Sequence, residues 1–137
     1  MVDQILSPTD LVGTWHLSRT IDDRLAHERL TVDGSTTLSV EADGRVRWYE
    51  SGTMNRGTDA LPVFRTLFVE PRGDDWFVTF EDGRDFHPWS PGAEVVHPCG
   101  ADTYTGHVEV LSPDRWAVTW RSEGPAKDYT MVSTLTH

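Results

Sequence analysis

The chain has 137 residues, with 22 Asp and Glu against 12 Lys and Arg and a net charge of −10 at pH 7. This acidic balance, with no cluster of basic residues, argues against attraction to DNA, RNA or anionic lipid, so we expect no nucleic-acid and no membrane partner. The length predicts a single domain over residues 1–137 that can bury a hydrophobic core without disulfides or metal.

The first ten residues, MVDQILSPTD, lack the basic and apolar regions of a secretory signal. No apolar run reaches the roughly 20 residues that a membrane-spanning helix needs. One cysteine, Cys99, cannot form an intrachain disulfide. We therefore expect a soluble cytoplasmic protein, and a homodimer is compatible with these properties.

The first predicted element is a helical turn at SPTD, with Ser7 as its cap, Pro8 at the first helical position and Asp10 three residues after the cap. Beyond it, runs rich in Val, Thr, Trp, Phe and Tyr are separated by turns of Gly, Pro, Asp, Asn or Ser. These runs predict nine strands, at residues 11–21, 28–40, 45–53, 62–70, 75–80, 84–89, 103–111, 115–122 and 127–136.

Several of these strands alternate apolar and polar residues, which is typical of half-buried antiparallel strands. Trp116, Val118 and Trp120 share one face of their strand, and Trp48 and Glu50 share a face of another. The short links imply antiparallel neighbours, and closure would remove the exposed edges of such a sheet. We expect an all-β, up-and-down barrel of about 8–10 strands, with a two-sheet sandwich as the alternative.

The segment SPTDLVGTW resembles the start of lipocalins and other calycin barrels, which begin with a helical turn and a Gly-x-Trp motif, here Gly13-Thr14-Trp15. Arg121 is one candidate for the basic residue that packs on this tryptophan in the family. The order of LVGTWHLSRTIDDR, WYESGT, FEDGRDFH, HPCGADTY and WAVTWRSEGPAKDY is similar to a bacterial family known only as a domain of unknown function. The resemblance implies an antiparallel calycin/lipocalin-like barrel and no established activity or site.

Polar residues in phase with an inward apolar face are the candidate binding residues, because a small barrel holds packed side chains or one small ligand. An inward Glu50 needs a partner, and we expect Arg65, either as a structural ion pair or as part of a ligand site. The inward phase of residues 62–70 stays open, because both alternating sets of side chains in this strand contain apolar residues.

On the last predicted strand, Lys127 and Tyr129 share a face. If this face points inward, the ammonium and the hydroxyl would bind a carboxylate or another anion. The alternative is a solvated Lys127 beside a core Tyr129. Tyr104 is expected to point inward as well, next to space left by Gly106.

The stretch EVVHPCGADTYTG, residues 94–106, is interpreted as a loop over one barrel mouth that leads into a strand. His87 precedes Pro88, which is disfavoured inside a sheet, so we expect this histidine near the rim. A zinc site drawn from His87, His97, Cys99 and Asp102 and a reactive Cys–His pair are the alternatives. We favour the loop, and predict no metal and no cofactor.

These features predict a small-molecule binding protein whose aromatic-walled, polar-anchored cavity holds a small hydrophobic or amphipathic molecule, with an anionic group as one option. The predicted ligand-binding residues are Trp48, Glu50, Arg65, His87, Tyr104, Trp120, Lys127 and Tyr129. The alternative is a cavity enzyme (isomerase, cyclase or lyase) in which Glu50, His87 or Asp102 transfers a proton, so enzymatic activity is left open. A haem-binding barrel and a structural or interaction domain without a ligand are further alternatives.

Overall fold

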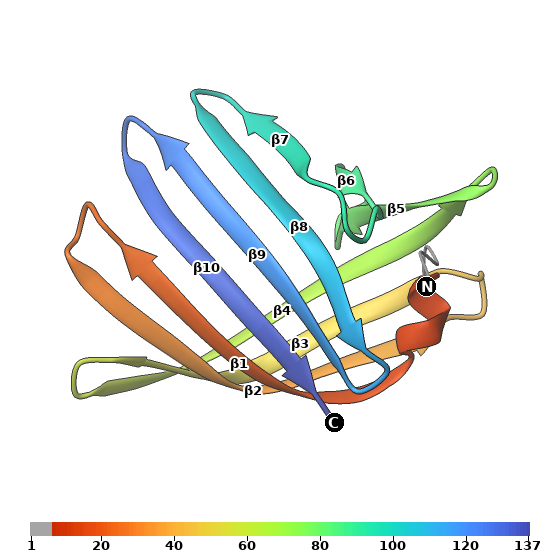
Figure 1. The fold of residues 1–137 in the computed structure, drawn as a ribbon, viewed down its shortest axis with the longest axis horizontal. Helices are drawn as coiled ribbons and strands as arrows, with labels where there is room; N and C mark the ends of the chain where they lie inside the picture. Colours follow the sequence, from red (N-terminus) through yellow and green to blue (C-terminus); the bar gives the residue numbers. More distant parts are fainter. Residues whose placement is uncertain (1–6) are drawn as a thin grey trace.

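The computed structural model describes residues 7–137, which form antiparallel β-sheet apart from one short helical turn (Figure 1). This turn is the 3-10 helix η1 (Pro8–Leu11), capped by Ser7 as predicted. Ten strands follow: β1 (Gly13–Asp23), β2 (Glu28–Val40), β3 (Val46–Arg56), β4 (Asp59–Arg72), β5 (Asp75–Phe80), β6 (Asp85–Pro88), β7 (Val95–Cys99), β8 (Asp102–Ser112), β9 (Arg115–Gly124) and β10 (Lys127–Thr136). The predicted ranges agree with β2, β5 and β10 residue for residue.

The ten strands form one sheet in the order β6-β5-β4-β3-β2-β1-β10-β9-β8-β7, and each pair of neighbours runs antiparallel. β1 joins the two ends of the chain by pairing with β10, for example at Leu17 and Leu135. The sheet curls until its edge strands β6 and β7 lie near each other (Figure 1), which makes a nearly closed barrel. The predicted all-β antiparallel barrel is confirmed, and the sandwich alternative is wrong.

β7 is the strand that the sequence interpretation missed, since its residues were assigned to a loop. It pairs with the start of β8, and the chain reverses between them over Gly100 and Ala101. Pro98 obscured this strand, because proline cannot donate to a ladder and is tolerated only where one side has no partner. β7 is such an edge strand. Gly100, with a φ of 63°, supplies the left-handed conformation of the tight turn.

The hydrophobic core lies at the end of the barrel where the strands converge, beside η1 and the C-terminus (Figure 1). Trp15 and Trp48 both pack against Trp116, with ring centroids 6.0 Å and 5.5 Å apart, and Trp48 also meets Trp89 at 6.3 Å. The indole of Trp15 donates to the carbonyl oxygen of Leu11 at 2.8 Å, which fixes η1 over this end. Aromatic side chains therefore fill the closed end of the barrel.

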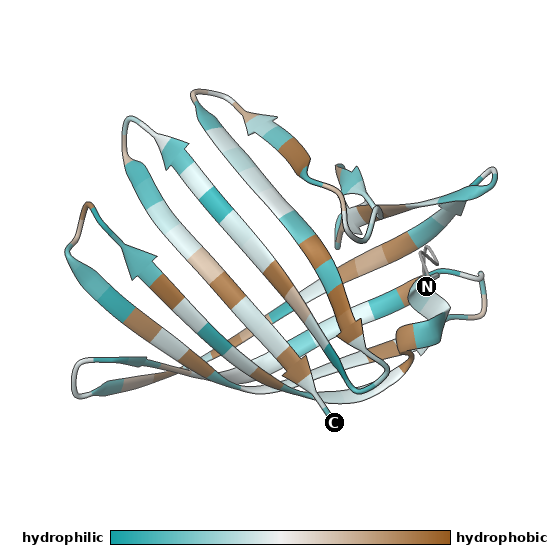
Figure 2. Cartoon of the chain, in the orientation of Figure 1, coloured by the Kyte–Doolittle hydropathy of each residue, from teal (hydrophilic) through white to brown (hydrophobic). Residues whose placement is uncertain are grey.

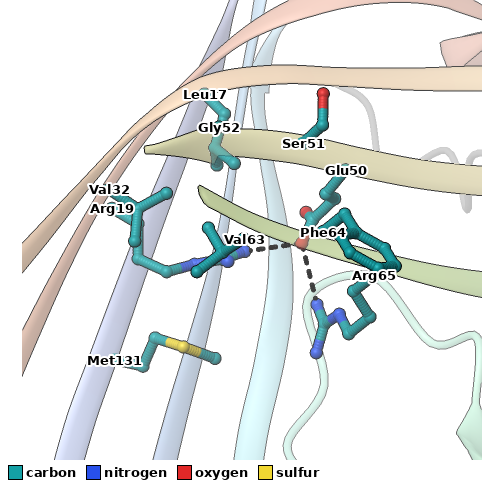
Figure 3. A pocket seen from close by; sticks show the side chains of 10 residues that line it. All are labelled: Leu17, Arg19, Val32, Glu50, Ser51, Gly52, Val63, Phe64, Arg65 and Met131. Carbon is teal, nitrogen blue, oxygen red and sulfur yellow. Dashed lines mark hydrogen bonds and ion pairs between the residues drawn. The ribbon is translucent and has the colours of Figure 1, made fainter. Parts of the chain in front are cut away.

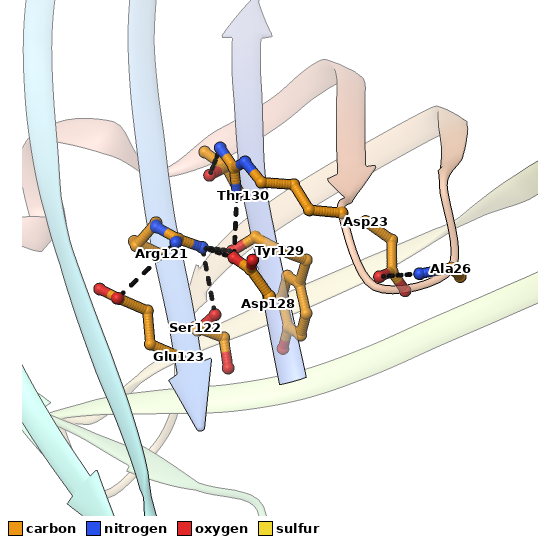
Figure 4. Close-up of polar contacts among 9 residues, drawn as sticks. Asp23, Ala26, Arg121, Ser122, Glu123, Asp128, Tyr129 and Thr130 are labelled. Carbon is orange, nitrogen blue, oxygen red and sulfur yellow. Dashed lines mark hydrogen bonds and ion pairs between the residues drawn. The ribbon is translucent and has the colours of Figure 1, made fainter. Parts of the chain in front are cut away.

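Apolar and polar residues alternate along the strands, most visibly on β1, β9 and β10 (Figure 2). The inward set of β9, which includes Trp116, Val118 and Trp120, is buried as the period of two predicts. Arg121 points the other way: it pairs with Asp128 at 2.6 Å and donates to the main-chain oxygen of Tyr129 (Figure 4). It is therefore not the partner of Trp15.

The ring that packs on Trp15 belongs to His137, at a centroid separation of 3.8 Å. His137 thus makes the contact with Trp15 for which Arg121 was one candidate. The residue that follows β10 therefore helps to close the base of the barrel.

Candidate functional site

The polar centre of the barrel is one carboxylate held between two guanidinium groups (Figure 3). Oε1 of Glu50 accepts from Nη2 of Arg19 at 2.8 Å and from Nη2 of Arg65 at 3.1 Å. Oε2 accepts from the hydroxyl of Thr36 and the indole of Trp48, both at 3.3 Å. Donors from the four consecutive strands β1 to β4 thus surround a single buried carboxylate.

The register of the sheet explains this cluster. Glu50 on β3 lies directly opposite Thr36 on β2 and Arg65 on β4, so the three side chains share one face. The inward phase of β4 therefore includes Arg65, whereas Phe64 points outward and is 78% exposed. The predicted pairing of Glu50 with Arg65 is confirmed.

Arg19 is the member of the cluster that sequence reasoning missed. It reaches Glu50 from β1, two strands away from β3. Arg19 follows Trp15 and Leu17 at intervals of two, and both of these are buried. An arginine in phase with a buried apolar set was the signal that could have identified it.

Glu50 is ionised at neutral pH. Burial alone raises the pKa of this carboxyl, but the charges of Arg65 and Arg19 outweigh that effect and hold the pKa below its ordinary value of 4.5. With four donors on its two oxygens, Glu50 is poorly placed to take up a substrate proton. Burial lowers the pKa of Arg65, and the negative charge of Glu50 partly offsets this decrease. The guanidinium keeps its charge, because arginine is not deprotonated in proteins.

Three hollows adjoin at Arg65. The inner one, about 100 Å³, lies among Arg65, Glu50 and Met131 (Figure 3). The second, about 450 Å³, extends from Arg65 along the outer part of β4 to the β5–β6 turn. The third, about 470 Å³, reaches the edge strands and is called the seam pocket: its lining residues are Arg65, Phe80, Arg84, Asp85, Phe86, His97, Pro98, Cys99 and Tyr104.

Aromatic rings build one wall of the seam pocket. Phe86 stacks on Phe80 with centroids 4.5 Å apart and, on its other side, is stacked with Trp120 at 5.0 Å. His97 on β7 meets the edge of Phe86 on β6 at 5.3 Å. Ring contacts thus connect the two edge strands of the described sheet, which are not neighbours in its hydrogen-bonded order.

The start of β10 carries a second polar group. Nζ of Lys127 donates to the hydroxyl of Tyr104 at 2.6 Å and lies 3.5 Å from a carboxylate oxygen of Asp102. The hydrogen bond with Tyr104 raises the pKa of this ammonium above 10.5. Lys127 therefore reaches from β10 past the end of β9 to β8, while Tyr129 follows on the same face of β10.

His87 lies in the barrel interior, so its predicted place at the rim is wrong. It is 3% exposed and its ring meets Trp120 at 5.1 Å. Nδ1 lies 2.8 Å from the carbonyl oxygen of Pro88, which identifies Nδ1 as the protonated, donating nitrogen. Burial lowers the pKa of His87 to about 4, so the ring is neutral at physiological pH.

The three candidates for proton transfer are thus differently engaged. Glu50 accepts hydrogen bonds on both oxygens, His87 is buried against Trp120, and Asp102 pairs with Lys127.

Within residues 7–137, no three His, Cys, Asp or Glu side chains lie close enough together to bind a metal ion, so the zinc alternative finds no support. The same range contains no helix with the length and apolar character of a membrane span.

Fold and site together define an antiparallel β-barrel with a tryptophan-filled base and a charged, aromatic open end. The chain belongs to a family of unknown function (DUF6314), whose model matches residues 11–137. This agrees with the predicted membership of such a family. No curated protein matches the sequence.

Solved structures similar to this chain are also β-barrel proteins. The redesigned β-barrel mFAP1, bound to DFHBI, has a TM-score of 0.53 at 16% identity, covering 95% of this chain and 97% of that one. An S-type phycobiliprotein lyase from Guillardia theta has a TM-score of 0.65 at 10% identity, covering 95% and 89%. A DUF3598 protein of unknown function from Nostoc punctiforme reaches 0.58 at 11% identity, covering 98% of this chain but 49% of that one. At these identities the likeness concerns the fold.

Proposed function

We propose that this protein binds a small organic molecule at the open end of its barrel, with a flat apolar part of the ligand against the rings of the seam pocket. The observation behind this proposal is the seam pocket itself. It has a volume of about 470 Å³, is lined by Phe80, Phe86 and Tyr104, and borders the charged Arg65. Ligand sites typically enclose roughly 300–1,000 Å³ and combine aromatic walls with a few polar groups.

Two comparisons support this proposal. The redesigned barrel of similar fold is bound to DFHBI, and another protein of similar fold is a phycobiliprotein lyase. The closed end of this barrel is filled by tryptophans, so space for a ligand lies at the opposite end.

Among the predicted ligand-binding residues, we propose Arg65 and Tyr104 as direct contacts. Trp120 stacks on Phe86 in the pocket wall, and the indole of Trp48 donates a hydrogen bond to Glu50. We also propose that the barrel is a single domain. Its cytoplasmic location, bacterial source and homodimeric state stay predictions.

The test is a ligand screen read by intrinsic tryptophan fluorescence, because Trp120 stacks on a ring of the pocket wall. We expect saturable quenching by flat organic molecules. In Cys99→Phe, the new ring would occupy the pocket and weaken binding at least about tenfold. Val96→Phe is the matched control, since Val96 lies on the same strand, is exposed and is not a lining residue.

The control should bind within about twofold of the wild type, because an exposed substitution leaves the pocket walls in place. Absence of any saturable ligand across broad metabolite classes would contradict the proposal. Equal binding by the Cys99→Phe and Val96→Phe variants would show that the ligand sits elsewhere.

A further inference from the structure

Arg65 uses little of its capacity to donate hydrogen bonds. A guanidinium carries five N–H donors. Within residues 7–137, Arg65 makes one hydrogen bond, from Nη2 to Glu50, and its Nε is buried without a partner. Arg19, in contrast, is held on both sides, with Nε donating to Ser133 at 2.7 Å and Nη2 to Glu50 at 2.8 Å. Nε is closed off from solvent, so the donors of Arg65 that are available for a ligand are those of Nη1 and the second N–H of Nη2.

The charges of the cluster do not cancel. Two guanidinium groups face one carboxylate, which leaves one positive charge in excess. The side chain of Arg65 is 36% exposed, against 11% for Arg19 and 4% for Glu50. The excess charge is thus accessible at Arg65, which borders all three hollows.

The other charged residues that line the seam pocket already have partners. Asp85 is paired with Arg72, outside the pocket lining, and Arg84 is paired with Asp82 at 2.8 Å. Asp85 therefore does not neutralise Arg65. The net charge of −10 repels anions at long range, so an anion must be attracted by local contacts.

We infer that the seam pocket takes an aromatic carboxylate, whose carboxylate group accepts from Nη1 and the remaining Nη2 N–H of Arg65 while its ring packs against Phe80 and the edge of Phe86. A planar carboxylate matches the planar fork of guanidinium donors, and charge-assisted pairs of this kind are the stronger hydrogen bonds of proteins. This inference rests on the proposed function, because it names the ligand class of the same pocket.

The experiment compares acids with neutral amides of the same shape by isothermal titration calorimetry. The pairs are benzoate with benzamide, naphthoate with naphthamide, and biphenyl carboxylate with biphenyl carboxamide. We expect the best acid to bind about tenfold more tightly than its amide at neutral pH, since only the acid carries the charge that strengthens the hydrogen bond.

Variants assign this preference to one side chain. Arg65→Met should abolish the preference for the acid, because acid and amide then both lose the hydrogen bond from Arg65 and keep the same contact with the rings of the wall. Arg84→Met is the matched control, since Arg84 lines the same pocket but is paired within its own turn. It should keep the preference. If Arg65→Met loses both ligands, Arg65→Lys decides, because it keeps the charge and should retain part of the preference.

The possible failures are distinguishable. Equal binding of acid and amide, equal losses in Arg65→Met and Arg84→Met, or no preference in Arg65→Lys would overturn the carboxylate inference and leave the proposed pocket intact. If no acid and no amide binds, the proposed function fails, and the inference fails with it.

Discussion

Two buried titratable side chains, Glu50 and His87, are accommodated in opposite ways. Glu50 keeps its charge because two guanidinium groups and two further donors replace the water it has lost. His87 has aromatic neighbours and one carbonyl acceptor, so burial favours its neutral form. Both groups have a lowered pKa in the folded chain, and both therefore make the fold less stable in acid.

We predict that the free energy of unfolding decreases between pH 6.5 and about 4 because of His87. In this window His87 is protonated in the unfolded chain but stays neutral in the folded one. The resulting loss of unfolding free energy reaches about 3 kcal/mol at the acid end of the window. Glu50 affects stability at lower pH than His87 does. Its contribution to the unfolding free energy is present above pH 4.5 and is lost as the pH falls toward its lowered pKa. Urea unfolding at a series of pH values measures both effects.

The variant His87→Gln should flatten the dependence between pH 6.5 and about 4, because the amide does not titrate. His16→Gln is the control, since the side chain of His16 is exposed on β1. An unchanged slope in His87→Gln would contradict the assignment to His87.

The strands β8 and β9 approach each other closely at Gly106. A Cβ at this position would lie 2.6 Å from Cε3 of Trp120 and 2.4 Å from the main-chain oxygen of Thr119. The space expected beside Gly106 is therefore occupied by the indole. The glycine allows Trp120 to lie flat across β8 and to support Phe86 in the wall of the seam pocket.

We predict that Gly106→Ala displaces Trp120 from Phe86 and destabilises the fold by about 2 kcal/mol, a typical cost of overpacking. Near-ultraviolet circular dichroism should report the moved indole, and urea unfolding the loss of stability. Glu109→Ala, at an exposed position on the same strand, should leave both signals unchanged. A stable Gly106→Ala variant with a native spectrum would contradict the packing role.

The barrel as a whole closes through side chains at the seam between β6 and β7. Each of these edge strands has one hydrogen-bonded neighbour in the described sheet, so their amides depend on fewer long-range contacts than those of β1 or β2. The stack of Phe80, Phe86 and Trp120, together with His97, connects the two sides.

We predict that Phe86→Ala accelerates hydrogen exchange in β7, although Phe86 itself lies on β6. Loss of the half-buried ring should also cost about 2 kcal/mol of unfolding free energy, less than for a fully buried phenylalanine. Phe64→Ala is the control, because that ring is 78% exposed. Equal exchange of β7 amides in the two variants would show that ring contacts do not hold the seam.

Much of the fold and part of the site could be predicted because they depend on local patterns. Turn residues and alternation placed nine of the ten strands and put Glu50 on a buried face opposite Arg65. Pro98 hid β7, because the tolerance of a sheet for proline depends on whether the strand lies at an edge. Arg19 was missed, since its contact with Glu50 crosses an intervening strand.

The barrel class, the capped turn before it and the inward phase of most strands are encoded locally in the sequence, since they follow from the period of two and from turn chemistry. The identity of the residues that meet where the sheet closes on itself depends instead on the three-dimensional fold. His97, Cys99 and Tyr104 share the seam pocket with Arg65, and His87 lies inside the barrel. Such neighbours are set by the curl of the whole sheet, which brings together strands that are distant in sequence and unpaired in the ladder.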